Sequence, residues 1–307
     1  MENKIVGAIF CFMSAVLISA RYISAAIFMS GVVSWNATLF AAGIGNLVRT
    51  KLIKHHYTLF LNISMSISAA CLAYALCLKL AEVLFHLPAF HEAGYICSIL
   101  FIIPGFPFIT SGIDLAKLDL RSGLERLTYA IIIILVATMF AWIMALLLDL
   151  QPLTFTSMSL NPILLLCLRI IASFCGVFGF SIMFNSTIPM AAIAALIGAV
   201  ANTFRLELID FTGMPPAAAA FIGALSAGLL ASEIKKNNGY PRISLTVPSI
   251  VIMVPGLYLY RAIYNFGIMS LTEAVSWFTS AIMIIIMLPL GLIFARILTD
   301  RAFRFCT

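Results

Sequence analysis

Long apolar runs alternate with short polar segments along the whole chain. Ten of these runs approach the length of about 20 residues that a helix needs to cross the hydrocarbon core of a bilayer. The shortest of them, the seventh, has 16 residues. The pattern predicts an all-α polytopic membrane protein with about ten transmembrane helices. We expect these helices at residues 5–28, 32–48, 58–80, 95–118, 123–148, 162–184, 188–203, 215–232, 245–266 and 271–297.

Polar segments between the runs predict the turns. Met29-Ser30-Gly31 is expected to be the first tight turn. A polar linker at residues 151–161 divides the chain into a first membrane repeat, residues 1–150, and a second, residues 162–307. Two further charged segments are expected to be loops, one with Arg49, Lys51 and Lys54, the other with Arg205, Glu207, Asp210 and Gly213.

The composition agrees with a membrane protein. Of the 307 residues, 63% are hydrophobic and 10% are charged, and the mean hydropathy is +1.12. A soluble domain carries about 25% charged residues, so membrane lipid is the expected surrounding. The seven cysteines include no CxxC pair and lie mostly inside apolar runs, where we expect them to be small core residues.

The net charge of +6 is spread over the ends of the runs and does not form one basic patch. This distribution argues against a nucleic-acid partner. If the N-terminus lies inside the cell, the inner segments hold 13 of the 18 basic residues. Basic residues favour the cytoplasmic side of a membrane, so both termini are expected to be cytoplasmic.

Two proline-glycine pairs interrupt apolar runs. Pro104-Gly105 lies within the fourth run and Pro255-Gly256 within the ninth. Proline removes a backbone donor and clashes with the preceding turn, and the freed backbone groups must find protein, ion or water partners within a membrane. Broken helices at corresponding places in two halves indicate the binding site of a transporter.

The second half of the chain repeats the first. Asn46 and Arg49 recur as Asn202 and Arg205, 156 residues later, and the proline-glycine pair recurs after 151 residues. Each repeat holds five predicted spans. Because five is odd, the second repeat must enter the membrane from the opposite face, which predicts two inverted five-helix repeats with broken fourth and ninth helices.

The helix that restarts after the first break turns its positive end toward the break, which suits a carboxylate. Asp114, two turns further on, has two interpretations. It could carry a proton or bind a cation, or it could pair with Lys117 or Arg121 at the membrane interface. The candidate substrate-binding residues here are Pro104, Gly105, Phe106, Pro107, Thr110, Ser111 and Asp114.

The second break also precedes polar side chains. Arg261 could hold a substrate carboxylate through two hydrogen bonds, or its head group could extend to the interface. The tyrosines of this segment could instead form an interfacial belt. The candidate substrate-binding residues here are Pro255, Gly256, Tyr258, Arg261 and Asn265.

Four other polar residues fall within or beside predicted spans. Arg21 and Arg169 are candidate counter-ions for Asp114, and extension to the interface is the alternative for both. Asn46 and Asn202 occupy equivalent places in the two halves and could cap a helix or line the cavity.

Enzyme motifs are missing from the sequence. It contains no HExxH, GxSxG, Walker or GxGxxG pattern. His86, His91 and Glu92 are expected to form a solvated loop rather than a metal site. We therefore expect no enzymatic activity, cofactor or metal. Transport would then use an ion gradient or the gradient of the substrate, unless a partner hydrolyses ATP.

The residues around both breaks resemble those of the threonine/serine exporter family. In the first half Pro104, Gly105, Pro107, Asp114, Gly123 and Arg126 match its signature, and residues 28–31 resemble its first turn. Residues 184–185, 202–205 and 254–256 resemble the companion half. That half is fused in the amino-acid exporters and is a separate subunit in bacterial two-component succinate exporters. Many relatives begin with a soluble region, which this chain is expected to lack.

The resemblance implies a bacterial plasma-membrane exporter of small polar metabolites, driven by the proton-motive force. Together with the breaks, it predicts a secondary exporter of carboxylate-bearing metabolites, with threonine or serine as the first choice and a proton as coupling ion. A dicarboxylate such as succinate is the alternative substrate. A non-transporting membrane scaffold or assembly factor is the alternative of another class. A homo-oligomer is compatible with either.

Overall fold

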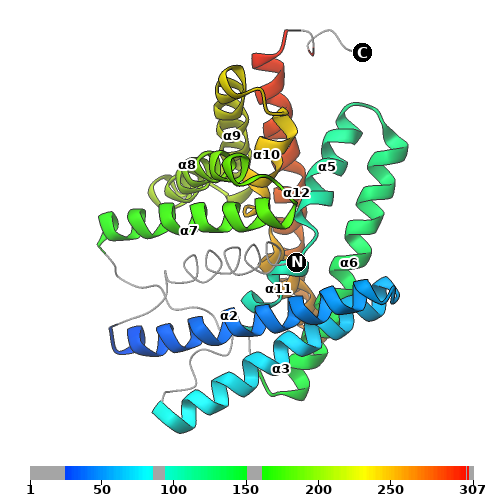
Figure 1. Ribbon diagram of the computed structural model, residues 1–307, viewed down its shortest axis with the longest axis vertical. Helices are drawn as coiled ribbons and strands as arrows, with labels where there is room; N and C mark the ends of the chain where they lie inside the picture. The colour runs from blue at the N-terminus through cyan, green and yellow to red at the C-terminus, as the bar shows by residue number, and fades with distance from the viewer. Residues whose placement is uncertain (1–24, 86–93, 151–160, 302, 304–307) are drawn as a thin grey trace.

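The computed structural model describes residues 25–85, 94–150, 161–301 and 303. All regular elements in these ranges are helices (Figure 1). They are α2 (Ala25–Lys54), α3 (Leu59–Phe85), α4 (Gly94–Ser98), the 3₁₀ helix η2 (Leu100–Ile102), α5 (Gly105–Ala116), α6 (Leu120–Leu147), α7 (Pro162–Met183), α8 (Ile188–Thr212), α9 (Pro216–Asn238), α10 (Arg242–Val251), α11 (Gly256–Gly267) and α12 (Leu271–Thr299).

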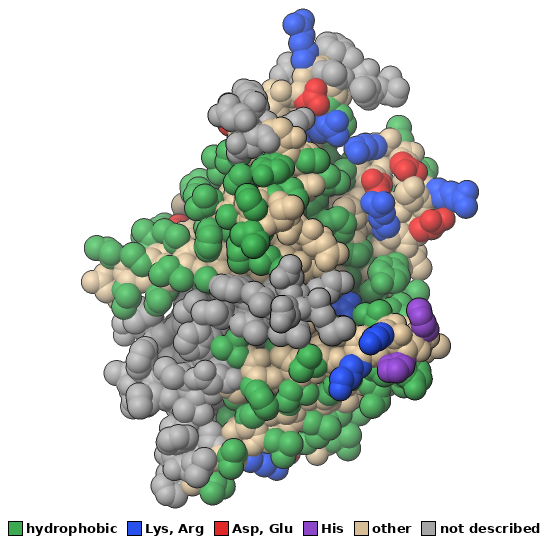
Figure 2. All heavy atoms as spheres, in the orientation of Figure 1, with side chains coloured by type: hydrophobic (Ala, Val, Ile, Leu, Met, Phe, Trp, Pro, Cys, Tyr) green, Lys and Arg blue, Asp and Glu red, His purple; other side chains and the backbone are tan. Residues whose placement is uncertain are grey.

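The surface of the helices is that of a membrane protein. Within the described residues, six helices are long and apolar enough to span a membrane, or up to eight spans are present if each of two bent pairs counts as one. Large side chains such as Leu76 and Phe278 are exposed, whereas alanines fill the interior. Figure 2 shows hydrophobic side chains over most of the described surface in this view, with charges gathered around the turn between α5 and α6 and near the end of α12. An apolar surface of this kind suits contact with lipid rather than with water.

Three of the expected turns and loops are helical instead. The predicted turn at Met29-Ser30-Gly31 is wrong, because α2 continues through these residues. The predicted loop around Arg49 belongs to the end of α2, and the one around Arg205 belongs to α8. Membrane helices tolerate glycine inside a span. The length of an apolar run is set by the thickness of the hydrocarbon core of the membrane. A helix can continue beyond the run into the polar region, so the run does not give the length of the helix.

Other boundaries follow local chemistry that the sequence makes visible. Pro162 opens α7 at the first helical position, and the Asn161 side chain accepts a hydrogen bond from the amide of Ile163 at 3.1 Å. Asp119 plays the same part for α6, accepting from the amide of Ser122 at 3.4 Å. Such residues satisfy amide groups that have no partner in the first turn of a helix.

Both predicted breaks are present. The α4–η2 segment meets α5 at 53°, and α10 meets α11 at 44°. After each break the chain forms a helical hairpin, α5 with α6 and α11 with α12 (Figure 1). The residues that follow α5 and α11 also match, because Leu118 and Met269 both adopt a left-handed conformation, with φ of 63° and 60°.

Each half of the chain contributes a helix to the core of the other half. The core around α2, α3 and α4 includes Tyr260 from α11, and the core around α8, α9 and α10 includes Ile109 from α5. These two residues lie 151 residues apart, at equivalent places after the two breaks. The halves are therefore interleaved, and the breaks lie where they meet.

Candidate functional site

The two breaks have nearly the same backbone geometry. Pro104 has φ −81° and ψ 59°, and Pro255 has φ −82° and ψ 53°. In each break the glycine amide turns back to the carbonyl two residues before it, Gly105 to Ile103 at 2.8 Å and Gly256 to Val254 at 2.9 Å. Each break thus satisfies the glycine amide internally and starts a new helix at the glycine.

The breaks also contact one another, and they do so reciprocally. A methyl group placed on Gly256 would overlap the Ile103 side chain, and one placed on Gly105 would lie 3.4 Å from a methyl group of Val254. Ile103 and Val254 are equivalent residues, as are the two glycines. We call this contact the crossing. A side chain on Gly256 would push the two breaks apart, whereas at Gly105 an added methyl group would make an ordinary contact with Val254.

An arginine supports each break from outside the broken helix. Arg49 of α2 donates from Nη1 to the carbonyl of Phe101 at 3.3 Å, and Arg205 of α8 donates from Nη1 to the carbonyl of Met253 at 3.3 Å. Both acceptors lie just before a proline-glycine pair, where a broken helix leaves carbonyls without their usual donors. Each of the repeated arginines therefore supplies a donor to a carbonyl that lies beside a break.

A tyrosine pair links the two broken helices. Tyr95 of α4 and Tyr260 of α11 share a hydrogen bond between their hydroxyl groups, and the two rings meet edge to face with centroids 5.8 Å apart. Both side chains are fully buried. Because buried hydroxyls need partners, this pair fixes the segment before one break against the segment after the other.

The predicted residues of the first half lie on or beside α5, but Asp114 does not face the crossing contacts. Thr110 and Ser111 are buried, and their hydroxyls donate to carbonyls within their own helix, of Phe106 at 3.0 Å and Phe108 at 2.9 Å. Asp114 accepts from Arg126 of α6 at 2.8 Å. The ion pair expected with Lys117 or Arg121 is therefore formed with Arg126 instead, across the α5–α6 hairpin.

The predicted residues of the second half lie along α11. Arg261 stacks over the ring of Trp277 with its guanidinium carbon 4.7 Å from the ring centroid, and Tyr258 meets the same ring edge to face. Asn265 is buried and donates to the carbonyl of Arg261 at 2.9 Å. Arg261 thus lies between α11 and α12, one and a half turns beyond the break.

The other candidate polar residues are separated from Asp114. Arg169 of α7 is buried and pairs with Glu207 and Asp210 of α8, so it is not the counter-ion of Asp114. Asn202 is buried and donates to the Ser173 hydroxyl at 2.8 Å. The Asn46 side chain is also buried, in α2. Arg21 lies outside the described residues.

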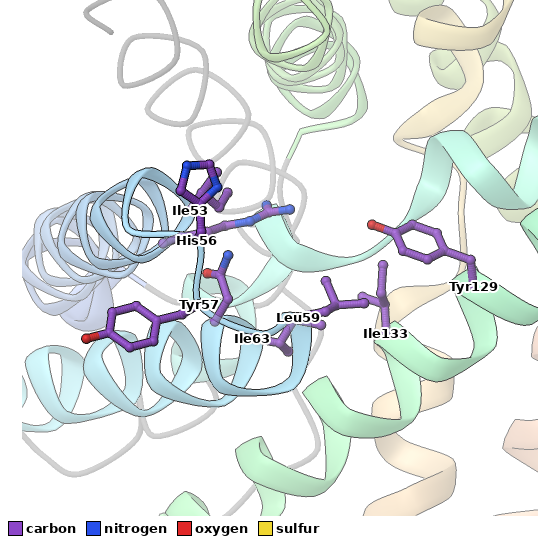
Figure 3. Close-up of a pocket in the computed structure, with 9 residues that line it drawn as sticks. Ile53, His56, Tyr57, Leu59, Ile63, Tyr129 and Ile133 are labelled. Atoms are coloured by element: carbon purple, nitrogen blue, oxygen red, sulfur yellow. The ribbon is translucent and has the colours of Figure 1, made fainter.

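A cavity of about 390 Å³ lies beside the first arginine (Figure 3). Figure 3 shows the α2–α3 turn on one side of it and Tyr129 of α6 on the other. Its wall is formed by Arg49, Ile53, His56, Tyr57, Leu59, Asn62, Ile63, Tyr129 and Ile133. No carboxylate is among these residues, and the described residues contain no cluster of metal ligands.

Sequence reasoning missed the roles of Arg49, Arg205 and Tyr95. A signal for the arginines was present, because Arg49 and Arg205 end the four-residue pattern that recurs in the two halves. Their place near the ends of apolar runs favoured loops. Tyr95 gave no signal, since its partner lies 165 residues away.

Two family models match the chain, one in its first part and one in its second. Residues 2–148 match a family model described as a threonine/serine exporter, and residues 169–298 match a second model, described as threonine/serine exporter, ThrE. No curated protein and no solved structure matches the chain. The two matches together cover both breaks and every described helix except residues 162–168 of α7 and residue 299 of α12, and on this basis the chain belongs to the threonine/serine exporter family.

Proposed function

We propose that the protein is a secondary active exporter of threonine and serine in the bacterial cell membrane, coupled to protons. Ten spans form two inverted repeats of five helices, with both termini cytoplasmic. The substrate binds between the broken fourth and ninth helices, and access to it alternates between the two sides of the membrane. Family membership supports export across a membrane, while the substrate, the coupling ion and the span count are part of the proposal.

The observation that carries this proposal is the reciprocal crossing of the breaks. Ile103 lies against Gly256, and its equivalent Val254 lies against Gly105. Arg49 and Arg205 each donate to a carbonyl two or three residues before the proline of a break. Such pairs of equal contacts are expected when two repeats are related by a two-fold axis that passes between them. A site on this axis can be opened from either side by the same movement.

The helix ends at the crossing suit a carboxylate. α5 and α11 both begin there, and the start of a helix carries a partial positive charge. The glycine amides are already bonded within the breaks and Pro107 has no N–H. The first-turn amides that lack a partner within the helix are therefore those of Phe106, Leu257 and Tyr258. An amino acid could place its carboxylate at these ends. Buried hydroxyls on α5, those of Thr110 and Ser111, lie within the next two turns.

Counterflow in proteoliposomes tests the proposal. Vesicles loaded with unlabelled threonine, serine or succinate are mixed with a trace of the same labelled compound, with and without a pH gradient. Uptake of labelled threonine or serine, increased by the gradient, is the expected result. Uptake of succinate alone would assign a dicarboxylate substrate. No uptake of any of the three by folded protein would contradict the proposal.

Asp114 provides the test of proton coupling. We expect Asp114→Asn to keep exchange of threonine but to abolish its response to the pH gradient, because an amide cannot take up the proton. Arg126→Gln is the matched control, since it breaks the same half-exposed ion pair while the carboxylate stays. If both variants lose the pH response equally, then the ion pair matters and the proton-carrying role of Asp114 is wrong.

A further inference from the structure

The cavity beside α2 contains a cation whose only described partner is a carbonyl. Arg49 donates from one nitrogen to Phe101 at 3.3 Å, a long hydrogen bond. Its guanidinium has five N–H groups, and none of the described residues that line the cavity carries a carboxylate. The positive charge of Arg49 lies next to the first break and among apolar helices, where it attracts an anion.

A second donor faces the same space. Asn62 of α3 is 5% exposed and lines the cavity. The Ser66 hydroxyl donates to the Asn62 backbone carbonyl at 2.6 Å and lies 3.4 Å from the Asn62 side-chain oxygen. Neither contact uses the side-chain amide nitrogen, which remains a donor. A carboxylate has two oxygens that accept several hydrogen bonds, so one guanidinium and one amide form a suitable pair of ligands.

The equivalent arginine of the second half packs against a neighbouring helix. Arg205 makes the same contact to its break, but it is packed against Gly223, and its Nε is buried without a partner among the described residues. The cavity beside Arg49 lies on the side of the α2–α3 turn, next to Lys51 and Lys54 in the last turn of α2.

We propose that this cavity is the entry site of the exporter, in which Arg49 and Asn62 bind the carboxylate of the substrate before it reaches the crossing. The entry site rests on the proposed exporter function and adds the residues that select a carboxylate. Arg49 then has two positions, one on the Phe101 carbonyl and one on the substrate. Because Arg49 also supports the first break, a bound carboxylate loosens that support as it arrives.

Binding of threonine to the purified protein, measured by isothermal titration calorimetry, tests the entry site. Arg49→Gln keeps a donor for the Phe101 carbonyl and removes the charge. We expect it to weaken binding by about ten- to a hundredfold, the size of a lost hydrogen bond to a charged group. Arg205→Gln is the matched control, because it changes the same contact at the other break, and it should alter binding less than threefold.

A second variant tests the entry site independently, in case Arg49→Gln fails to fold. Asn62→Asp has the same size and keeps the acceptor for Ser66, but it places a carboxylate against Arg49. We expect it to abolish threonine binding while the thermal midpoint stays close to that of the unaltered protein. Threonine methyl ester, which lacks the carboxylate, should bind equally weakly to the unaltered protein and to Arg49→Gln.

The outcomes separate the entry site from the exporter function. Equal binding by the unaltered protein, Arg49→Gln and Asn62→Asp would overturn the entry site, even if counterflow of threonine is normal. Equal losses of threonine binding in Arg49→Gln and Arg205→Gln would mean that both arginines only support the breaks. That result would also overturn the entry site. Threonine binding that depends on Arg49 without any counterflow would support the site and contradict the exporter function.

Discussion

At the scale of the residue, Arg169 shows how the protein accommodates a charge among apolar helices. Its guanidinium donates from Nη1 to Glu207 at 2.6 Å and from Nη2 to Asp210. The two carboxylates are three residues apart on α8, so they lie on the same face of that helix. The Arg169 side chain is only 5% exposed. The cluster therefore fastens α7 to α8 and depends on all three charges.

Replacing Arg169 by methionine is expected to lower the free energy of unfolding by about 3–5 kcal/mol, because two carboxylates then lack their cation. The midpoint of thermal unfolding in detergent measures the change. The triple variant Arg169→Met, Glu207→Leu, Asp210→Leu is the control and should recover most of the loss, since it leaves no unpaired charge. Equal destabilisation of the single and triple variants would attribute the loss to packing.

At the scale of the element, α9 and α12 pack closely through small residues. Gly228 of α9 lies against Ala295 of α12, and Gly291 of α12 lies against the backbone of α9 at Phe221. Buried alanines at three- and four-residue intervals line the same face of α9: Ala220, Ala224, Ala227 and Ala231. Without water to drive helices together, close packing of this kind holds membrane helices in contact.

A methyl group on Gly291 should separate these two helices. Its carbon would lie 2.5 Å from the carbonyl oxygen of Phe221, which is backbone and cannot rotate away. We expect Gly291→Ala to lower the free energy of unfolding by about 1–3 kcal/mol. Gly43→Ala, in α2, is the control.

Gly43 has nothing within 4 Å of the added carbon. Its replacement should be neutral or stabilising by up to about 1 kcal/mol, because alanine favours a helix. Thermal unfolding of the two variants side by side measures the difference. Similar midpoints would mean that the α9–α12 contact adjusts without cost.

The breaks and helix ends show which features could be predicted from the sequence. The breaks at Pro104 and Pro255 were predictable, because the loss of an amide donor is a property of proline itself. The ends of α2 and α8 were not, since Arg49 and Arg205 look like interfacial residues until the carbonyls they serve are in place. The ion pair between Asp114 and Arg126 depends on how two helices pack, and a local sequence pattern does not predict that packing.

At the scale of the whole molecule, the interleaved halves make the crossing a shared hinge region. α5 packs against α10 and α12 of the second half, and α11 packs against α6 of the first. A movement of one half therefore moves a helix inside the core of the other. If access alternates as proposed, the two breaks must shift relative to one another at the crossing.

A disulfide across the crossing tests this movement. In a background without the native cysteines, Gly105→Cys with Val254→Cys should cross-link, because the added carbon at residue 105 lies 3.4 Å from the Val254 side chain. We expect oxidation to reduce counterflow at least tenfold and reduction to restore it. The single-cysteine variants control for the substitutions. Full counterflow by cross-linked protein would show that the crossing stays rigid during transport.

Leu118 and Met269 have similar backbone conformations at equivalent places in the two halves. Both adopt a left-handed conformation after the helix that follows a break, and neither is the glycine that such a conformation favours. Their side chains differ, yet their φ angles agree to within 3°. After each of them the next amide donates to a carbonyl five residues earlier, Asp119 to Asp114 at 3.1 Å and Ser270 to Asn265 at 2.9 Å. Both hairpins therefore begin at a helix end that is closed by backbone hydrogen bonds, and these bonds hold a residue other than glycine in a conformation that it would rarely adopt by itself.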